Sequence, residues 1–418
     1  MRKLCIKNLS VCIVALFVSQ TTYCQTEAIK FEKFAIAQDS LMKLAYKNLD
    51  TDTYKTLLVE FDLKFNALAK SSQQQMLPYY QGAYYNLACT FSLLGKKEQA
   101  LASLQKSVDA GFSNYSTIET DDDLKNIRAE HRFFAILAQA RSIGDYLFIL
   151  KKAADFDNSD FRVLPSFIYQ ESNDPNLKSL RDGFKLDSVV GQGNDVSRII
   201  NLMHWIHNYI PHDGQHANPV AYNAEILIRT CKAQKRGLNC RGLATVLNEC
   251  YLAMGYPSRL VICLPKDSLK IDPDCHVITT VFVKSLAKWI WMDPTNNAYV
   301  MDQNGNLLGI EEVRKALIND MQLILNPDAN WNNKQSVTKD DYLYNYMAKN
   351  LYRFEVPVES KYDLENPNNK SIVYIDLSPL EYFDQKPDKT ESLNSKNHCN
   401  YIRYKTNNEA QFWAVPSF

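Results

Sequence analysis

The stretch "NCRGLATVLNECYLAMGYPSRLVICL" (Asn239–Leu264) contains the pattern of a helix, a stop signal and a strand in direct succession. Apolar residues recur at helical spacing up to Met254, and Gly255 with a proline close behind ends the helix. The apolar run Ser258–Leu264 then predicts a buried strand. The helix is therefore expected to begin near Cys240.

Cys240 is a candidate nucleophile because of this position. Free N–H groups and the positive end of the dipole at a helix N-terminus stabilise a thiolate, which lowers the thiol pKa from its usual value of about 8.5. The backbone N–H of Cys240 is also placed to donate to a developing oxyanion. Gly237 is expected to leave room for a substrate chain. The alternative is that Cys240 is a small buried core residue.

A nucleophilic thiol also needs a base and a group that orients the base. The downstream stretch "DCHVITTVFVKSLAKWIWMDPT" (Asp274–Thr295) contains candidates for both, His276 and Asp293. The pattern predicts a β-hairpin with a short turn at Lys284–Ala287. A turn centred in the middle of that segment sets Asp293 opposite Ile278. Because strand side chains alternate, His276 then shares a face with Asp293, diagonally and within reach of an imidazole N–H. A turn centred half a residue away breaks this pairing, and each residue alone has a structural alternative.

The order Cys, His, Asp, with "NCRGLATVLNE", "MGYPSRLV", "CHVITTVFV" and "KWIWMDPT" around it, resembles the transglutaminase-like superfamily of papain-type folds. The likeness covers roughly residues 175–327. It implies that Cys240 is the nucleophile, His276 the general base and then acid, and Asp293 the group that holds the imidazole. The chain departs from the family where Leu238 replaces a frequent glycine and Val277 a frequent aromatic residue.

The second oxyanion donor is not defined by these motifs. Gln234 lies six residues before Cys240, as the corresponding glutamine does in papain-like enzymes, and is the candidate.

The resemblance implies acyl transfer through a thioester. Water as the acceptor gives hydrolysis of a peptide or side-chain amide, whereas a lysine amine gives an isopeptide crosslink. For an exported protein we expect hydrolysis, because water is the abundant acceptor. The expected partner is a peptide or protein substrate, and no cofactor is implied.

Two other functions remain open. In the first, the chain is a non-catalytic binding module with an idle transglutaminase-like scaffold, which a disulfide between Cys240 and Cys275 would favour. In the second, a zinc amidase uses the histidine cluster His204, His207, His212 and His216. No CxxC pair and no HExxH pattern is present, so we expect no metal site.

The N-terminal part is rich in Ala, Leu, Lys and Gln and predicts helices throughout. Within it, "AYYNLACTFSLLGKKEQALASLQKSVDAGF" (Ala83–Phe112) resembles a tetratricopeptide repeat. The small Ala88 and Ala100 allow two antiparallel helices to approach closely, and Gly95 permits the turn. Such helices either bind a protein partner or serve as a scaffold for the next domain. The expected fold class is α+β: a transglutaminase-like core with a cysteine-bearing helix on an antiparallel sheet, preceded by this all-α, tetratricopeptide-like domain.

The first 24 residues predict a secretory signal, because a basic start precedes the apolar run Leu9–Ser19 and a cleavage site before Gln25. The run is too short for a spanning helix of about 20 residues. Lipid attachment at Cys24 is disfavoured by the large Tyr23, so the mature protein is expected in the periplasm or outside the cell, with no membrane span. The predicted divisions are a signal peptide (1–24), a tetratricopeptide-like helical domain (25–150), a linker and lead-in (151–190), a transglutaminase-like core (191–327) and a β-rich extension (328–418).

The charge balance gives no sign of a nucleic-acid or anionic-lipid partner. The chain of 418 residues has 47 Lys+Arg and 47 Asp+Glu, and removal of the signal would leave a small negative charge. Nothing in this balance favours nucleic acid or anionic lipid.

Overall fold

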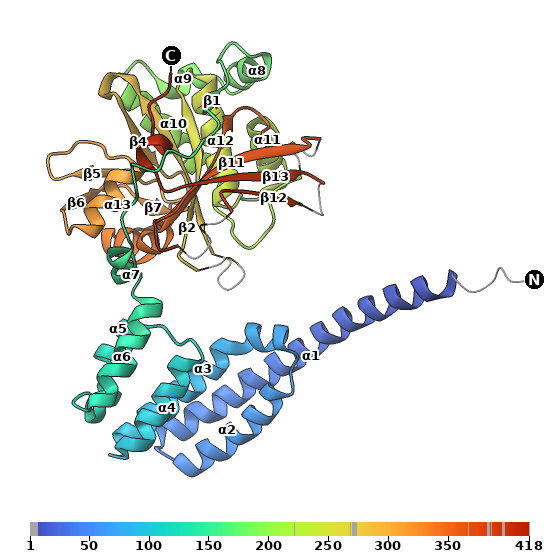
Figure 1. Cartoon of the computed structure of the whole chain (residues 1–418), viewed down its shortest axis with the longest axis vertical. Coiled ribbons are helices and arrows are strands. Elements are labelled where there is room, and N and C mark those ends of the chain that lie inside the picture. The colour runs from blue at the N-terminus through green and yellow to red at the C-terminus, as the bar shows by residue number, and fades with distance from the viewer. Residues whose placement is uncertain are drawn as a thin grey trace, which may run out of the picture. The chain divides into compact units, whose positions relative to one another are not determined.

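The computed structural model describes residues 7–417 apart from 221, 268, 270–273, 367, 383, 384, 386 and 395–397, with side chains described from residue 27 onward. The first six residues of the predicted signal lie outside the described part. The chain divides into two compact units, residues 1–148 and residues 149–418 (Figure 1).

The first unit is helical, as predicted. Its main helices are α1 (Lys7–Lys47), α2 (Thr51–Asn66), α3 (Lys70–Leu93), α4 (Lys97–Asp109), α5 (Tyr115–Thr120), the 3-10 helix η1 (Asp122–Ile127) and α6 (His131–Gly144). Gly95 has a φ of 70° between α3 and α4, a conformation that favours glycine. Ala88 and Ala100 are fully buried where these two helices pack together. The structure shows the helix pair, and its tetratricopeptide character stays a prediction.

No single helix among the described residues is both long and apolar enough to cross a membrane. One helix pair, α6 with α7 (Tyr146–Lys152), has together the length and apolar composition of a membrane span. The two helices are bent by 80° relative to each other.

The second unit is built on a sheet that joins strands from distant parts of the chain (Figure 1). Its strands are β2 (Ser258–Leu264), β3 (His276–Val283), β4 (Lys288–Met292), β9 (Arg353–Pro357), β11 (Ser371–Leu377), β12 (Lys389–Leu393) and β13 (Asn400–Thr406). Within the described residues they form one seven-stranded sheet in the order β12-β13-β11-β9-β2-β3-β4. The pairs are antiparallel except β11 with β13, so the sheet is mixed rather than purely antiparallel.

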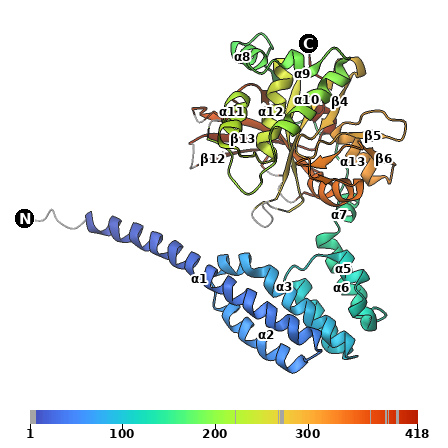
Figure 2. The same ribbon diagram turned by 180° about the vertical axis from the view of Figure 1, so that it is seen from behind.

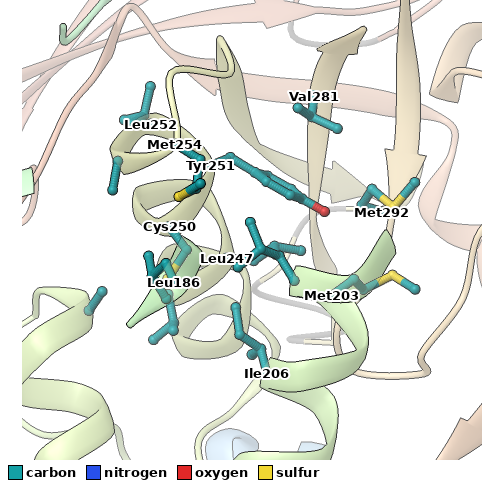
Figure 3. Packing of buried hydrophobic residues seen from close by; sticks show 14 of the residues in the cluster. Leu186, Met203, Ile206, Leu247, Cys250, Tyr251, Leu252, Met254, Val281 and Met292 are labelled. Carbon is teal, nitrogen blue, oxygen red and sulfur yellow. The ribbon is translucent and has the colours of Figure 1, made fainter. Parts of the chain in front are cut away.

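Helices pack on one side of this sheet (Figure 2). They are α8 (Pro175–Gly183), α9 (Leu186–Val190), α10 (Asp195–Tyr209), α11 (Ala224–Gln234) and α12 (Cys240–Ala253). α12 contacts β2 and β3 directly, and α10 and α11 pack on α12. In Figure 3 the ring of Tyr251 extends from α12 toward Val281 and Met292 of the sheet. Its hydroxyl donates to the Ile199 carbonyl at 3.0 Å, which satisfies the buried polar atom. The α+β class is confirmed.

Shorter elements complete the second unit. They are β1 (Ile168–Tyr169), the 3-10 helix η2 (Lys284–Leu286), β5 (Val300–Asp302), α13 (Ile310–Ile318), β6 (Leu323–Leu325), β7 (Asn330–Trp331), β8 (Gln335–Ser336), the π-helix η3 (Asp340–Met347), α14 (Ala348–Asn350), β10 (Glu359–Ser360) and α15 (Glu409–Phe412).

The register of the β3–β4 hairpin agrees with the sequence prediction. Thr279 pairs with Met292 and Val283 with Lys288, on either side of η2. Continued by one residue, this register sets Asp293 opposite Ile278. The left-handed φ of 51° at Ala287 closes the turn.

Candidate active site

Cys240 is the first residue of α12, and its surroundings fix the start of that helix. Asn239 caps the helix, because its side-chain oxygen accepts from the Gly242 N–H at 3.1 Å. The Asn218 side chain holds this cap from both directions: its oxygen accepts from the Asn239 N–H at 3.0 Å and its nitrogen donates to the Asn239 side chain at 2.6 Å. Cys240 itself is partly exposed.

Gly237 does not leave the open space that the sequence suggested. A Cβ on this residue would lie 2.4 Å from the Pro211 carbonyl oxygen and 2.8 Å from the Asp213 Cβ. The loop that precedes Cys240 therefore packs backbone to backbone against residues 211–213. The physical need for glycine here is this close approach and not passage of a substrate.

His276 and Asp293 form a buried pair beside Cys240. His276 is the first residue of β3 and Asp293 directly follows β4. The His276 Nε2–H donates to Asp293 Oδ2 at 2.8 Å, and the two residues are 1% and 0% exposed. Burial by itself lowers the pKa of His276, but the Asp293 charge and the hydrogen bonds raise it to about 10. Burial likewise raises the pKa of Asp293, and His276 reverses this effect and lowers it to about 2.

The Cys240 thiol lies beside the same imidazole, and each of the two groups shifts the pKa of the other. Since Nε2 is bonded to Asp293, Nδ1 is the ring nitrogen left to exchange a proton with the thiol. Burial raises the pKa of Cys240, but His276 and the backbone N–H of Val277 outweigh it, so the pKa is lower than that of an ordinary thiol. A lowered thiol pKa beside a raised imidazole pKa favours a thiolate–imidazolium pair.

The Asp293 carboxylate accepts several more hydrogen bonds. Oδ2 accepts from the Tyr342 hydroxyl at 2.6 Å and from the Asn296 side chain at 3.0 Å. Oδ1 accepts from the Thr295 N–H at 2.8 Å. The Tyr342 hydroxyl in turn accepts from the Trp291 indole N–H at 3.2 Å, which orients its proton toward the carboxylate. These donors keep Asp293 ionised although it is fully buried.

Tyr342→Phe is expected to lower kcat/KM about tenfold. The change removes a hydrogen bond to a buried charge, worth about 1.5–3 kcal/mol, and 1.4 kcal/mol corresponds to tenfold. The carboxylate then holds the imidazolium less strongly. Steady-state kinetics on an amide substrate measure the loss, with Tyr344→Phe from the same π-helix as the matched control. Equal losses of kcat/KM in Tyr342→Phe and Tyr344→Phe would contradict a specific role of the Tyr342 hydroxyl at Asp293.

Tyr346 is a second π-helix residue at the site. Its hydroxyl lies 3.3 Å from His276 Nδ1 and its ring packs edge-on against the imidazole at 5.2 Å. Tyr342 and Tyr346 are four residues apart in "DDYLYNYM" (Asp340–Met347), which places them on one face of a helix. That spacing is visible in the sequence, but nothing in it connects the segment to the triad.

The other predicted site residues lie as follows. Gln234 ends α11 with an exposed side chain, and its role as an oxyanion donor stays a prediction. The four clustered histidines have separate partners: His204 faces Asp328, His207 the Pro294 carbonyl and Asn330, His212 the Trp331 indole, and His216 Asp213. Among the described residues no group of three or more His, Cys, Asp or Glu side chains is arranged to hold a metal.

The cysteines of the described side chains are all free thiols: Cys89, Cys231, Cys240, Cys250, Cys263, Cys275 and Cys399. The disulfide between Cys240 and Cys275 that would favour an idle scaffold is therefore not formed in this structure. Burial, followed by the nearby Cys240, raises the pKa of Cys275 to about 11, so this neighbour is the less reactive thiol.

One of three comparisons with known proteins finds a family match that covers the candidate site. No curated protein matches the sequence significantly. A solved structure from Cytophaga hutchinsonii, provisionally described as a cysteine protease, is similar with 16% identity and a TM-score of 0.23, over 40% of this chain and 56% of that chain. The chain thus spans little more than half the length of that protein. Residues 184–294 match the transglutaminase-like superfamily, a segment that includes Cys240, His276 and Asp293. The chain therefore contains a transglutaminase-like domain at residues 184–294.

Proposed function

We propose that the protein is an exported, cysteine-dependent acyl-transfer enzyme that hydrolyses peptide or side-chain amide bonds. The observation that carries the proposal is the buried, hydrogen-bonded His276–Asp293 pair beside a thiol that lies at a helix N-terminus and has a lowered pKa. This arrangement supplies a nucleophile, a proton carrier and an orienting charge at one place. The match of the same segment to the transglutaminase-like superfamily supports it.

The proposed steps use these residues as follows. The Cys240 thiolate attacks the amide carbon, and the backbone N–H of Cys240 donates to the oxyanion that develops. His276 then gives its Nδ1 proton to the departing amine while Nε2 remains bonded to Asp293. A water molecule, deprotonated by His276, attacks the thioester and releases the acid and the free thiol.

The acceptor decides between hydrolysis and crosslinking. We propose water, and a peptide or protein as the substrate; the helices of the first unit are the proposed site for a protein partner. An assay with a glutamine peptide, with and without an added lysine analogue, separates the two reactions. Release of ammonia with no amine incorporation supports hydrolysis, whereas incorporation of the amine assigns the chain to crosslinking.

Alkylation of Cys240 tests the proposal without a known substrate. Iodoacetamide is applied from about pH 4 to about pH 9, and the rate at Cys240 is mapped by peptide mass spectrometry. Because the pKa of Cys240 is lowered, we expect fast alkylation well below the usual thiol pKa of about 8.5. The ion pair should persist until the pH approaches the raised pKa of His276, about 10.

His276→Ala is the matched variant for this experiment. Removal of the imidazole leaves burial as the main influence on the thiol, so the pKa of Cys240 should rise and alkylation at low pH should slow. An inert Cys240 in both proteins would remove the enzyme hypothesis and favour the non-catalytic binding module.

A further inference from the structure

His207 contacts the segment that carries Asp293, whereas the sequence pattern indicates only a metal-ligand role for it. It lies on α10 and is 3% exposed. Its Nδ1 lies 3.0 Å from the Pro294 carbonyl oxygen. A carbonyl oxygen only accepts hydrogen bonds, so Nδ1 must carry a proton and donate it.

The peptide unit between Pro294 and Thr295 connects this contact to the candidate triad. Its carbonyl accepts from His207, and its N–H donates to Asp293 Oδ1 at 2.8 Å. The carbonyl and the N–H belong to one rigid plane. A hydrogen bond that fixes the carbonyl therefore also fixes the N–H that holds the carboxylate.

The second nitrogen of His207 is held as well. Nε2 lies 2.9 Å from the side-chain oxygen of Asn330. The orientation of that amide is set by two other bonds, since its nitrogen donates to the Asp328 carbonyl at 2.9 Å and its oxygen accepts from the Asn333 N–H at 2.7 Å. Both ring nitrogens thus face acceptors, and the ring satisfies both contacts only when each nitrogen carries a proton.

Three other titratable groups surround this ring. His204 on the same helix is a like charge when protonated, and burial lowers its pKa. Asp328 pairs with His204 at 3.1 Å, and Asp293 lies one residue before Pro294.

We propose that His207 is a positioning residue for Asp293, which acts by donating from Nδ1 to the Pro294 carbonyl and so fixes the Pro294–Thr295 peptide. The proposal rests on the proposed function, because it concerns the orientation of the group that holds His276. His207 contacts no reacting atom in this arrangement. Its loss should alter the protonation behaviour of the triad rather than substrate affinity.

Two substitutions separate the two nitrogens of His207. The side-chain nitrogen of asparagine is as many bonds from Cα as Nδ1, so His207→Asn keeps a donor for the Pro294 carbonyl. The nitrogen of glutamine corresponds to Nε2, so His207→Gln keeps only the contact with Asn330. His131→Gln, in the other unit, is the control for the loss of an exposed histidine.

The readout is the pH profile of Cys240 alkylation, together with kcat and KM where a substrate is known. We expect His207→Gln to lower the rate below neutral pH about tenfold, within the roughly 100-fold that small misplacements cost, and to reduce kcat with little change in KM. His207→Asn should remain within about twofold of wild type. A wild-type profile in His207→Gln, or equal losses in both variants, overturns the proposal. If Cys240 of the wild-type protein is unreactive at low pH, the proposed function itself is contradicted, which distinguishes that outcome from failure of the His207 proposal alone.

Nitrogen-15 NMR of the histidine rings in the wild-type chain tests the proposal even where a variant does not fold. The seven histidines of the chain give few signals. We expect a protonated Nδ1 on His207. A His207 ring with the proton on Nε2 alone would exclude donation to the Pro294 carbonyl and overturn the proposal.

Discussion

Asp293→Asn is expected to lower kcat about 10⁴-fold while the protein stays folded. The side chain keeps its size, so the packing around the fully buried residue is retained. The substitution changes the number of oxygen atoms that can accept hydrogen bonds at this position. The carboxylate accepts from His276, Tyr342, Asn296 and the Thr295 N–H, and an amide has only one oxygen to offer.

The substitution is expected to change the tautomer of His276. The amide oxygen is kept by the Thr295 N–H, so the new NH₂ group faces His276 Nε2. That nitrogen must then accept, which moves the imidazole proton to Nδ1, the nitrogen that faces the thiol. A neutral ring protonated at Nδ1 cannot take a proton from Cys240, so the base is lost although all three residues remain in place.

Two measurements check this result. The alkylation profile of Cys240 should shift to higher pH, because the pKa of His276 is no longer raised by a negative charge. Circular dichroism should show an unchanged fold. Asp302→Asn, at the end of β5 where the carboxylate accepts from the Asn304 N–H and the Asn306 side chain, is the control. Wild-type kcat in Asp293→Asn would show that this residue does not orient the base.

The hairpin and the cysteine helix could be predicted because their signals are local. The turn length between β3 and β4 fixes which residues face each other, and strand alternation fixes the face. The register of the structure therefore brings Asp293 to His276 as the pattern indicated. The start of α12 at Cys240 follows from Asn239, a residue type that is favoured at the N-cap.

The contribution of the C-terminal segment could not be predicted. Tyr342 reaches Asp293 across 49 residues of sequence, and β9 enters the sheet beside β2. Such contacts depend on long-range pairing, for which a single sequence carries no local signal. The π-helix that carries Tyr342 also has no periodicity that distinguishes it from an ordinary helix in the sequence. Gly237 is a different case. The sequence indicates correctly that a glycine is needed there, but it does not show that the need comes from close packing against the loop at residues 211–213.

Cys240→Ala is expected to lower kcat about 10⁶-fold, the loss typical of removing a nucleophile from a triad. The thiol is partly exposed and Asn239 keeps the helix capped, so the fold should be retained. Alkylation at low pH should disappear with it, since burial raises the pKa of other thiols such as Cys250 and Cys263.

Cys275→Ala is the sharpest control for this experiment, because the two thiols lie close together and only one is expected to react. Cys275 directly precedes β3, and burial, then the nearby Cys240, raises its pKa to about 11. Its removal should therefore leave kcat within about twofold of wild type, since it gives up a small partly buried side chain and no proton carrier. If Cys275→Ala were as inactive as Cys240→Ala, the reactive unit would be the pair of thiols. That outcome would contradict the assignment of Cys240 as the single nucleophile of the acyl transfer.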